Sequence, residues 1–386
     1  MNPHVRLFIP GPGDVEPDVL AAMAQPVQRH YGPEWMAMYG ETRTLLQQIF
    51  GTANQLFIVP GPASAALEMA MGSLLPIGSK VIVGQNGFFG DRLADLAVAH
   101  GLTVVPVTAP IGQRLDPDVL RGVCDAHPDA SVVAFVHHET GTTVLNPVQE
   151  LAAVARAAGR VVVVDAVSSM GGAELSVDHW GIDVCVAAPN KCLEGPAGMA
   201  FISVGPRAWD LIDSHAGIGA GWYLNLRTWR RYADEWGAWH PTPVTASSNT
   251  LLGILTSLRA IMEVGLSVHI AKYAKAGRAV RDGLGKMGFV PFVPEAFGAP
   301  MVTAFHARPE FAVGEFATWL LDERHIAISG GLGDLSGKIF RVGHLGRAAS
   351  AEYISDLLEA VGAFLRQRGL GGEPPRSGKL QARNKK

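Results

Sequence analysis

Two short apolar runs, each closely followed by a charged residue, constrain the fold more than any other feature of the sequence. Four consecutive valines occupy positions 161–164 and lead into Asp165. A second, mostly apolar run covers residues 182–188 and is followed by Lys191. Such short, largely β-branched runs are typical of strands buried on both faces of a parallel sheet. Because ligands bind at the carboxyl ends of these strands, the sequence brings a carboxylate and an amine to one candidate site.

The order of the elements predicts the fold class. Strands and helices alternate from residue 56 to residue 191, which predicts an α/β fold with a mostly parallel sheet, helices on both faces and right-handed crossovers. The next strand, at residues 198–204, is expected to return antiparallel. After two long helices, the pattern predicts a smaller α+β unit with strands at 289–293, 301–305 and 338–342.

These patterns divide the chain into four parts. The tail is rich in glycine, proline and basic residues, which is typical of a segment without a packed core. We expect an N-terminal arm (1–20), a large domain (21–250), a small C-terminal domain (251–368) and a disordered tail (369–386).

The composition excludes several classes of protein. The chain has 386 residues, of which 48% are hydrophobic and 17% charged, and this suits a large buried core. A net charge of −3 offers no basic field for nucleic acid or an anionic membrane. No apolar run reaches the roughly 20 residues that span a bilayer, and no signal-peptide core is present. The three cysteines have no paired or metal-like spacing, so we expect a reducing cytoplasm.

A lysine and a carboxylate at the ends of two successive strands suit one cofactor in particular. The lysine amine forms a Schiff base with the aldehyde of pyridoxal phosphate, and the carboxylate keeps the ring nitrogen protonated. The alternative is an ordinary strand-end Asp165 and a surface Lys191 without a chemical role. The spacing alone does not decide between these two interpretations.

A glycine turn before a helix predicts the phosphate site of such a cofactor. Residues 56–59 form a predicted strand, residues 60–63 a turn, and Ser64 heads a helix, which directs N–H groups and the positive end of the helix dipole at an anion. Pro62 lacks an N–H, so one donor is missing there. Ser64 supplies an amide and a hydroxyl, although the same position suits a simple helix N-cap.

Two other motifs are set aside on spacing. The adjacent His137 and His138 before Glu139 suggest a metal site, but neighbouring side chains on a strand point to opposite faces and no third ligand stands at a recognisable spacing. Residues 330–338 suggest a phosphate-binding P-loop, but position 332 is leucine and Ile339 follows Lys338. A rival interpretation is a non-catalytic nucleotide-binding module on a similar sheet. The sequence lacks the Gly-x-Gly-x-x-Gly turn that such a module has after its first strand, and this interpretation gives Lys191 no role.

Residues 164–172 (Val-Asp-Ala-Val-Ser-Ser-Met-Gly-Gly) and 190–198 (Asn-Lys-Cys-Leu-Glu-Gly-Pro-Ala-Gly) resemble the cofactor segments of class V aminotransferases. The alanine–glyoxylate and serine–glyoxylate enzymes are the nearest, and the pyridoxamine–pyruvate and 2-aminoethylphosphonate–pyruvate aminotransferases are close neighbours. The resemblance extends from about residue 10 to about residue 346. It implies the fold type I architecture, pyridoxal phosphate held by Lys191 as an internal aldimine, and ping-pong half-reactions.

The resemblance also implies individual roles. Lys191 and Asp165 are the expected catalytic residues, Phe89 lies on the cofactor ring, and Thr140 stands near it. In the family, loop 141–143 usually reads Ser-Thr-Gly, so its Gly-Thr-Thr sequence leaves the loop shape open. The expected cofactor contacts are Pro62, Ala63, Ser64, Phe89, Thr140, Asp165, Val167, Asn190, Lys191, Trp239 and Thr242.

Substrate binding is implied at three further residues. Arg341 matches the family's substrate arginine, and a planar guanidinium suits a bidentate carboxylate; the alternative is a strand arginine paired with Asp334 or another acid. The arm at Gly11 and the loop at Tyr31 lie near the active site in the family. No metal site is expected.

The family gives the stretch at residues 239–242 to the neighbouring subunit. Thr242 matches the family's threonine, and Trp239 stands where a tyrosine hydroxyl donates to the cofactor phosphate; an indole N–H can also donate. The resemblance therefore implies a homodimer with shared active sites, and a dimer of dimers stays open.

A single matched arginine argues against a dicarboxylic substrate. We expect a small amino acid, alanine or serine, as donor and a keto acid, glyoxylate or pyruvate, as acceptor. Pyridoxamine–pyruvate transamination is an alternative, although that family has glutamate at the place of Pro62 and an extra arginine at the place of Leu332. A 2-aminoethylphosphonate–pyruvate aminotransferase is the third candidate.

Overall fold

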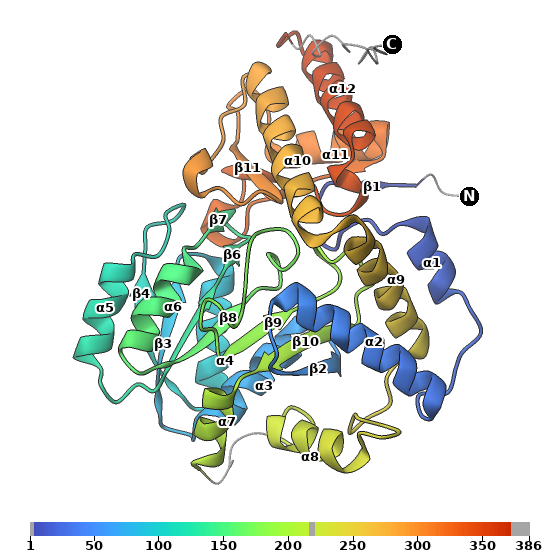
Figure 1. Ribbon diagram of the computed structural model, residues 1–386. Helices are drawn as coiled ribbons and strands as arrows, with labels where there is room; N and C mark the ends of the chain where they lie inside the picture. The colour runs from blue at the N-terminus through green and yellow to red at the C-terminus, as the bar shows by residue number, and fades with distance from the viewer. Residues whose placement is uncertain (1–3, 216–220, 372–386) are drawn as a thin grey trace, which may run out of the picture.

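A computed structural model describes residues 4–215 and 221–371, and its centre is a seven-stranded sheet (Figure 1). The strand order is β2-β10-β9-β8-β5-β3-β4. All neighbours pair in parallel except β10, which is antiparallel to both β9 and β2, so the predicted antiparallel return is confirmed. The strands are β2 (Gln55–Pro60), β3 (Lys80–Gln85), β4 (Thr103–Thr108), β5 (Val132–Val136), β8 (Val161–Asp165), β9 (Val184–Ala187) and β10 (Met199–Val204).

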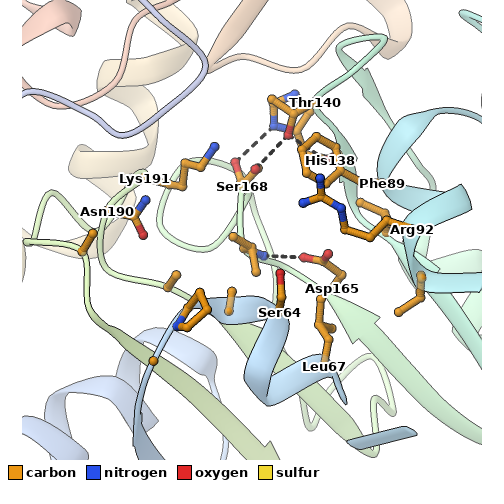
Figure 2. A pocket seen from close by; sticks show the side chains of 18 of the residues that line it. Ser64, Leu67, Phe89, Arg92, His138, Thr140, Asp165, Ser168, Asn190 and Lys191 are labelled. Atoms are coloured by element: carbon orange, nitrogen blue, oxygen red, sulfur yellow. Dashed lines mark hydrogen bonds between the residues drawn. The ribbon is translucent and has the colours of Figure 1, made fainter. Parts of the chain in front are cut away.

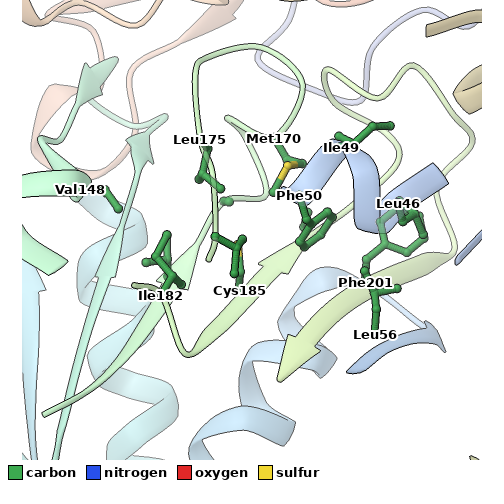
Figure 3. Packing of buried hydrophobic residues seen from close by; sticks show 14 of the residues in the cluster. Leu46, Ile49, Phe50, Leu56, Val148, Met170, Leu175, Ile182, Cys185 and Phe201 are labelled. Carbon is green, nitrogen blue, oxygen red and sulfur yellow. The ribbon is translucent and has the colours of Figure 1, made fainter. Parts of the chain in front are cut away.

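The four valines of β8 explain why this strand is central. Val162 and Val164 belong to one hydrophobic cluster, and Val161 and Val163 belong to another, as expected from side chains that alternate across a sheet. Both faces of β8 are therefore covered. Figure 3 shows part of the first cluster, where Phe50 packs near strands β9 and β10. Full burial of such an aromatic side chain contributes about 1.5–3 kcal/mol.

Helices cover both faces of the sheet, as predicted. Four helices contribute buried side chains to the first cluster: α2 (Pro33–Phe50), α5 (Pro117–Ala126), α6 (Val148–Ala157) and α9 (Ser248–Val264). Four others contribute to the second: α3 (Ala63–Leu74), α4 (Phe88–Ala99), α7 (Pro206–Asp213) and α8 (Leu226–Trp236).

A smaller C-terminal sheet forms a separate hydrophobic cluster with three helices. Its strands are antiparallel in the order β11-β14-β13. The strand predicted at 289–293 was wrong, because only an isolated bridge joins Pro291 to Phe305, and a proline has no N–H to continue a ladder. The elements are α10 (Leu266–Lys286), β11 (Val302–His306), α11 (Val313–Arg324), β13 (Ser329–Gly330), β14 (Ile339–Gly343) and α12 (Ala351–Gln367).

The domain boundaries stay predictions. The expected tail lies, from residue 372 onward, outside the described residues.

The short elements are α1 (Pro17–Met23), β6 (His138–Glu139), β7 (Val144–Leu145), and the 3-10 helices η1 (Glu295–Phe297), η2 (Gly333–Leu335) and η3 (Arg347–Ala349).

The N-terminal arm joins the large sheet to the smaller one. Strand β1 (Arg6–Leu7) pairs in parallel with β12 (Ile326–Ala327). The Gly343 N–H donates to the Phe8 carbonyl over 2.8 Å, and the Gly13 N–H donates to the Asn190 carbonyl over 2.9 Å. The arm thus runs between the end of β14 and the turn that carries Lys191.

Within residues 4–215 and 221–371, no helix taken alone is long and apolar enough to cross a membrane. Helices α9 and α10 meet the length and composition criteria only as a pair, and the pair is bent by 91° at its break.

Candidate active site

One cavity of about 370 Å³ gathers most residues with a predicted role. It lies at the carboxyl end of the sheet, where β5 ends at Val136 and β8 ends at Asp165. Figure 2 shows Lys191 and Asp165 on different sides of this cavity. The lining includes nine of the predicted residues: Pro62, Ala63, Ser64, Phe89, Thr140, Asp165, Val167, Asn190 and Lys191.

The Lys191 side chain is half-buried in the turn that follows β9. Its Nζ donates to the carbonyl of Pro10. Burial lowers the pKa of Lys191 to about 8, although the nearby Asp165 carboxylate acts in the opposite direction. A neutral amine, which is the nucleophilic form, therefore predominates above about pH 8.

Gly11 lies directly against this amine. It has a φ of 130°, and a Cβ added there would stand 2.4 Å from Nζ of Lys191. Any side chain at position 11 would both strain the backbone and displace the lysine. The structure thus brings Gly11 next to Lys191.

Asp165 is a buried carboxylate that accepts a hydrogen bond on only one of its two oxygens among the residues described. Its Oδ1 accepts the Val167 N–H over 2.9 Å, and no second hydrogen bond to this carboxylate exists among the residues described. Burial raises the pKa of Asp165 to about 6, whereas the Val167 N–H, Lys191 and Arg92 favour the ionised form. At neutral pH the group is mainly a carboxylate that can hold a protonated nitrogen inside the cavity.

The start of α3 provides an anion cradle. Helix α3 begins at Ala63 with Pro62 as the N-cap residue, so the interpretation of Ser64 as the cap was wrong. The N–H groups of Ala63 and Ser64 have no intrahelical partner at this end of the helix, and both residues line the cavity. Figure 2 shows the Ser64 hydroxyl directed toward the cavity. Because Pro62 has no N–H, the donors at this end of the helix are these two amides and the Ser64 hydroxyl.

A buried glutamate fixes the aromatic wall of the cavity. Glu139 Oε2 accepts the N–H groups of Phe89 and Gly90, each over 2.9 Å, and Oε1 accepts the Gly141 N–H over 2.9 Å. Burial raises the pKa of Glu139 to about 7 against these three donors. The carboxyl group joins the start of α4 to loop 140–143 and so settles the position of Phe89.

Sequence reasoning missed three polar residues of the cavity lining, Arg92, His138 and Ser168. The Arg92 guanidinium lies over the Phe89 ring at 5.1 Å. Helix α4 starts at Phe88, directly after Gly87, so Phe89 and Arg92 lie about one helical turn apart. The glycine before the helix is the sequence signal that could have placed these two residues together.

The two histidines of the rejected metal motif point to different surroundings. His138 Nδ1 donates to the Ser168 carbonyl over 3.1 Å, while the His137 ring meets Trp180 edge-on at 5.9 Å. Burial lowers the pKa of each histidine to about 3, so both rings are neutral. The Thr140 hydroxyl donates to the Ser168 hydroxyl over 2.8 Å, on the cavity wall.

Arg341 lies just behind that wall. Its Nε donates to the Gly330 carbonyl over 2.9 Å, and its Nη1 donates to the Thr140 carbonyl over 3.0 Å. Neither partner is Asp334, which was the alternative for this strand arginine. Burial lowers the pKa of Arg341 while Glu139 raises it. The guanidinium adjoins the cavity through Thr140 but is not part of its lining.

Three predicted residues lie away from the cavity. Tyr31 and Trp239 are 45% and 47% exposed, and their rings contact each other edge-on at 6.3 Å. Thr242 is buried, and its hydroxyl donates to the Val244 carbonyl over 2.8 Å. None of the three lines the cavity formed by the same chain.

The residues present fit pyridoxal phosphate. The cavity offers an amine with a lowered pKa, a buried carboxylate with one free side, a helix N-terminus and an aromatic ring. These match in turn the aldehyde, the ring nitrogen, the phosphate and the ring face of that cofactor.

The class V aminotransferase family model matches residues 18–348. The chain belongs to this family. Over 351 residues it is 32% identical to an uncharacterized aminotransferase of Methanocaldococcus jannaschii, a match that covers 91% of this chain and 90% of the relative. It is also 27% identical to the pyridoxamine–pyruvate transaminase of Mesorhizobium japonicum, covering 93% and 91%, and 29% identical to the 2-aminoethylphosphonate–pyruvate transaminase of Syntrophobacter fumaroxidans, covering 89% and 92%.

Solved structures agree with this assignment. The fold matches an alanine–glyoxylate aminotransferase from Nostoc with a TM-score of 0.90 at 29% identity, covering 95% of this chain and 96% of that one. It matches the ureidoglycine–glyoxylate aminotransferase of Bacillus subtilis with a TM-score of 0.90 at 28% identity, covering 98% and 96%. The aminotransferase therefore has the fold type I architecture and carries out transamination that depends on pyridoxal phosphate.

Proposed function

We propose that this aminotransferase transfers the amino group of a small amino acid, alanine or serine, to glyoxylate or pyruvate, with Lys191 as its cofactor lysine. The observation that carries the proposal is that Lys191 and Asp165 line one cavity. The cavity volume of about 370 Å³ is modest, and Arg341 adjoins it as the carboxylate partner. The names of the two solved relatives, which act on glyoxylate, support the same substrate class.

Each residue has a separate task. Bound pyridoxal phosphate supplies the electron sink that stabilises negative charge on the substrate Cα. With the cofactor bound, Lys191 would accept the substrate's Cα proton through its neutral amine and would deliver it to the C4′ carbon of the cofactor. Asp165 would keep the ring nitrogen of the bound cofactor protonated, and the start of α3 would hold its phosphate. Arg341 orients the substrate carboxylate by charge-assisted hydrogen bonds.

Two other substrate specificities are alternatives to this proposal. Pyridoxamine–pyruvate and 2-aminoethylphosphonate–pyruvate transamination are supported by relatives of similar identity. In this chain Pro62 caps the phosphate cradle, and Leu332 lines a second cavity beside Gly141. Neither side chain carries a charge, which favours a donor without a second ionised group.

A donor panel tests the proposal. With glyoxylate and with pyruvate as acceptors, alanine or serine is expected to give the highest kcat/KM, measured by keto-acid formation. Pyridoxamine, 2-aminoethylphosphonate and aspartate serve as matched donors, and aspartate adds one carboxylate without a partner. If neither alanine nor serine turns over while another donor does, the proposed donor class is wrong.

We infer that the active enzyme is a homodimer whose partner subunit completes each site. The exposed Tyr31 and Trp239 rings support this inference, because large exposed aromatic side chains mark interaction surfaces. The Thr242 hydroxyl is bonded within its own chain, so it would need to turn before it could serve the partner.

The cysteines are buried and free, consistent with a reducing compartment, and the cytoplasm stays a prediction.

Mixed dimers test the shared site. Lys191→Ala and Trp239→Ala are each expected to lower activity, and refolding them together is expected to restore part of it, since a hybrid dimer then contains one intact site. Steady-state activity against mixing ratio is the measurement. An activity that never exceeds the weighted sum of the two variants would show that each chain builds its site alone.

A further inference from the structure

The turn that carries Lys191 is tied down along its backbone. The Glu194 N–H donates to the Lys191 carbonyl over 3.2 Å, and the Gly195 N–H donates to the Pro189 carbonyl over 2.9 Å. The Asn190 carbonyl accepts the Gly13 N–H from the N-terminal arm. These bonds set the shape of the turn, and the arm, which also accepts the Gly343 N–H through the Phe8 carbonyl, ties the turn to one end of β14.

Helix α10 makes a second set of contacts to the same turn. His269 Nε2 donates to the Cys192 carbonyl over 2.7 Å. The Tyr273 hydroxyl donates to Glu194 Oε1 over 2.5 Å, and the Lys272 ammonium forms an ion pair with the same carboxylate. The side chain of Glu194 is only 12% exposed, so its charge depends on these two donors for solvation.

The left-handed backbone conformation of Glu194 indicates that its side chain has a structural role. Its φ is 57°, in the left-handed region that favours glycine and costs other residues free energy. Glycine would satisfy the turn more easily. A glutamate at this position is accounted for by what its carboxylate binds on α10.

Cys192 links this turn to the substrate side of the site. Its side chain is fully buried in the hydrophobic cluster of the smaller sheet, together with Tyr273 and with Phe340 and Val342, which flank Arg341 on β14. The residue next to Lys191 therefore packs in the same core as the strand that carries Arg341.

We propose that Glu194, Lys272 and Tyr273 form a latch that positions Lys191 relative to Arg341, which makes Glu194 a positioning residue for the proposed cofactor lysine. The latch rests on the proposed role of Lys191. It holds the C-terminal end of the turn to α10, so that the Lys191 amine in the cavity and the Arg341 guanidinium behind the cavity wall keep one spacing.

The experiment compares Glu194→Gly with Glu194→Gln in the full-length protein. The glycine variant keeps the left-handed turn and removes the latch, whereas the glutamine variant keeps the side-chain shape and removes its charge. Displacing a reacting group by about 1 Å can cost roughly 100-fold in rate. We expect about a 10- to 100-fold slower attachment of pyridoxal phosphate to Lys191 in Glu194→Gly, an intermediate loss in Glu194→Gln, and faster amide hydrogen exchange in residues 189–196.

Matched variants keep the outcome interpretable. Lys275→Met removes a charge one turn further along α10 and is expected to leave both readouts unchanged, because no ion pair of Lys275 is present among the described residues. Tyr273→Phe repeats the test from the other side of the latch should Glu194→Gly fold poorly. Peptide mapping of the wild-type attachment site comes first, since attachment elsewhere than Lys191 would disprove the proposed function instead. Unchanged attachment in Glu194→Gly and Tyr273→Phe, with or without a change in exchange, would overturn the latch.

Discussion

Replacing Lys191 with alanine is expected to abolish covalent binding of pyridoxal phosphate and to lower kcat/KM by at least about 10³-fold. On the proposed function, the variant loses both the amine proposed to attach the cofactor and the base proposed to move the Cα proton, and general acid–base catalysis alone contributes about 10²- to 10⁴-fold. Loss of the visible absorption band of the attached cofactor and steady-state rates with the preferred donor are the measurements.

Chemical rescue distinguishes loss of the base from loss of the fold. A small primary amine such as methylamine is expected to restore part of the Lys191→Ala activity, because the vacated space lies inside a cavity that reaches solvent. Lys275→Ala, on the surface of α10, serves as the lysine control. A Lys191→Ala enzyme that keeps both the absorption band and the rate would show that another amine holds the cofactor.

Replacing Asp165 with asparagine is expected to lower kcat by about 10- to 150-fold, because a charge-assisted hydrogen bond to the ring nitrogen is worth about 1.5–3 kcal/mol. The amide preserves the shape and can still accept the Val167 N–H. Covalent attachment at Lys191 is expected to survive, so the absorption band stays while turnover falls. Pre-steady-state half-reactions measure the loss.

The same carboxylate gives a pH signature. Burial raises the pKa of Asp165 to about 6, so the ionised form that attracts a protonated ring nitrogen is lost as the pH falls through about 6. Cofactor affinity in the wild-type enzyme is expected to weaken more steeply over that range than in Asp165→Asn, where only the protonation of the Lys191 amine remains as a cause. Equilibrium binding between pH 5 and 8 compares the two. An identical pH dependence in both proteins would remove Asp165 from the cofactor site.

Local sequence signals predicted much of the fold. The valines of β8 specified a strand buried on both faces, and the strand–helix alternation specified the parallel sheet around it. The signal failed at Pro291, where apolar residues flank a proline that has no N–H to continue a ladder.

The site shows the same division. Asp165 and Lys191 follow buried strands, so their meeting at one sheet edge was predictable. Glu139 binding the start of α4 was not, because its partners are backbone N–H groups 49 and 50 residues away, which carry no side-chain signature. Glu194 was equally hidden, since its partners lie on α10 nearly 80 residues later.

By itself the sequence determined that the sheet is mostly parallel, that Asp165 and Lys191 follow two of its strands, and which cofactor chemistry suits this pair. These features follow from burial periodicity and covalent reactivity, which are local properties of the residues. Only the tertiary structure decided which helix fixes the lysine turn, that Gly11 touches the amine and that Arg341 reaches the cavity through the Thr140 carbonyl. Those contacts depend on how separate elements pack, and packing geometry is set by the whole core rather than by any one segment.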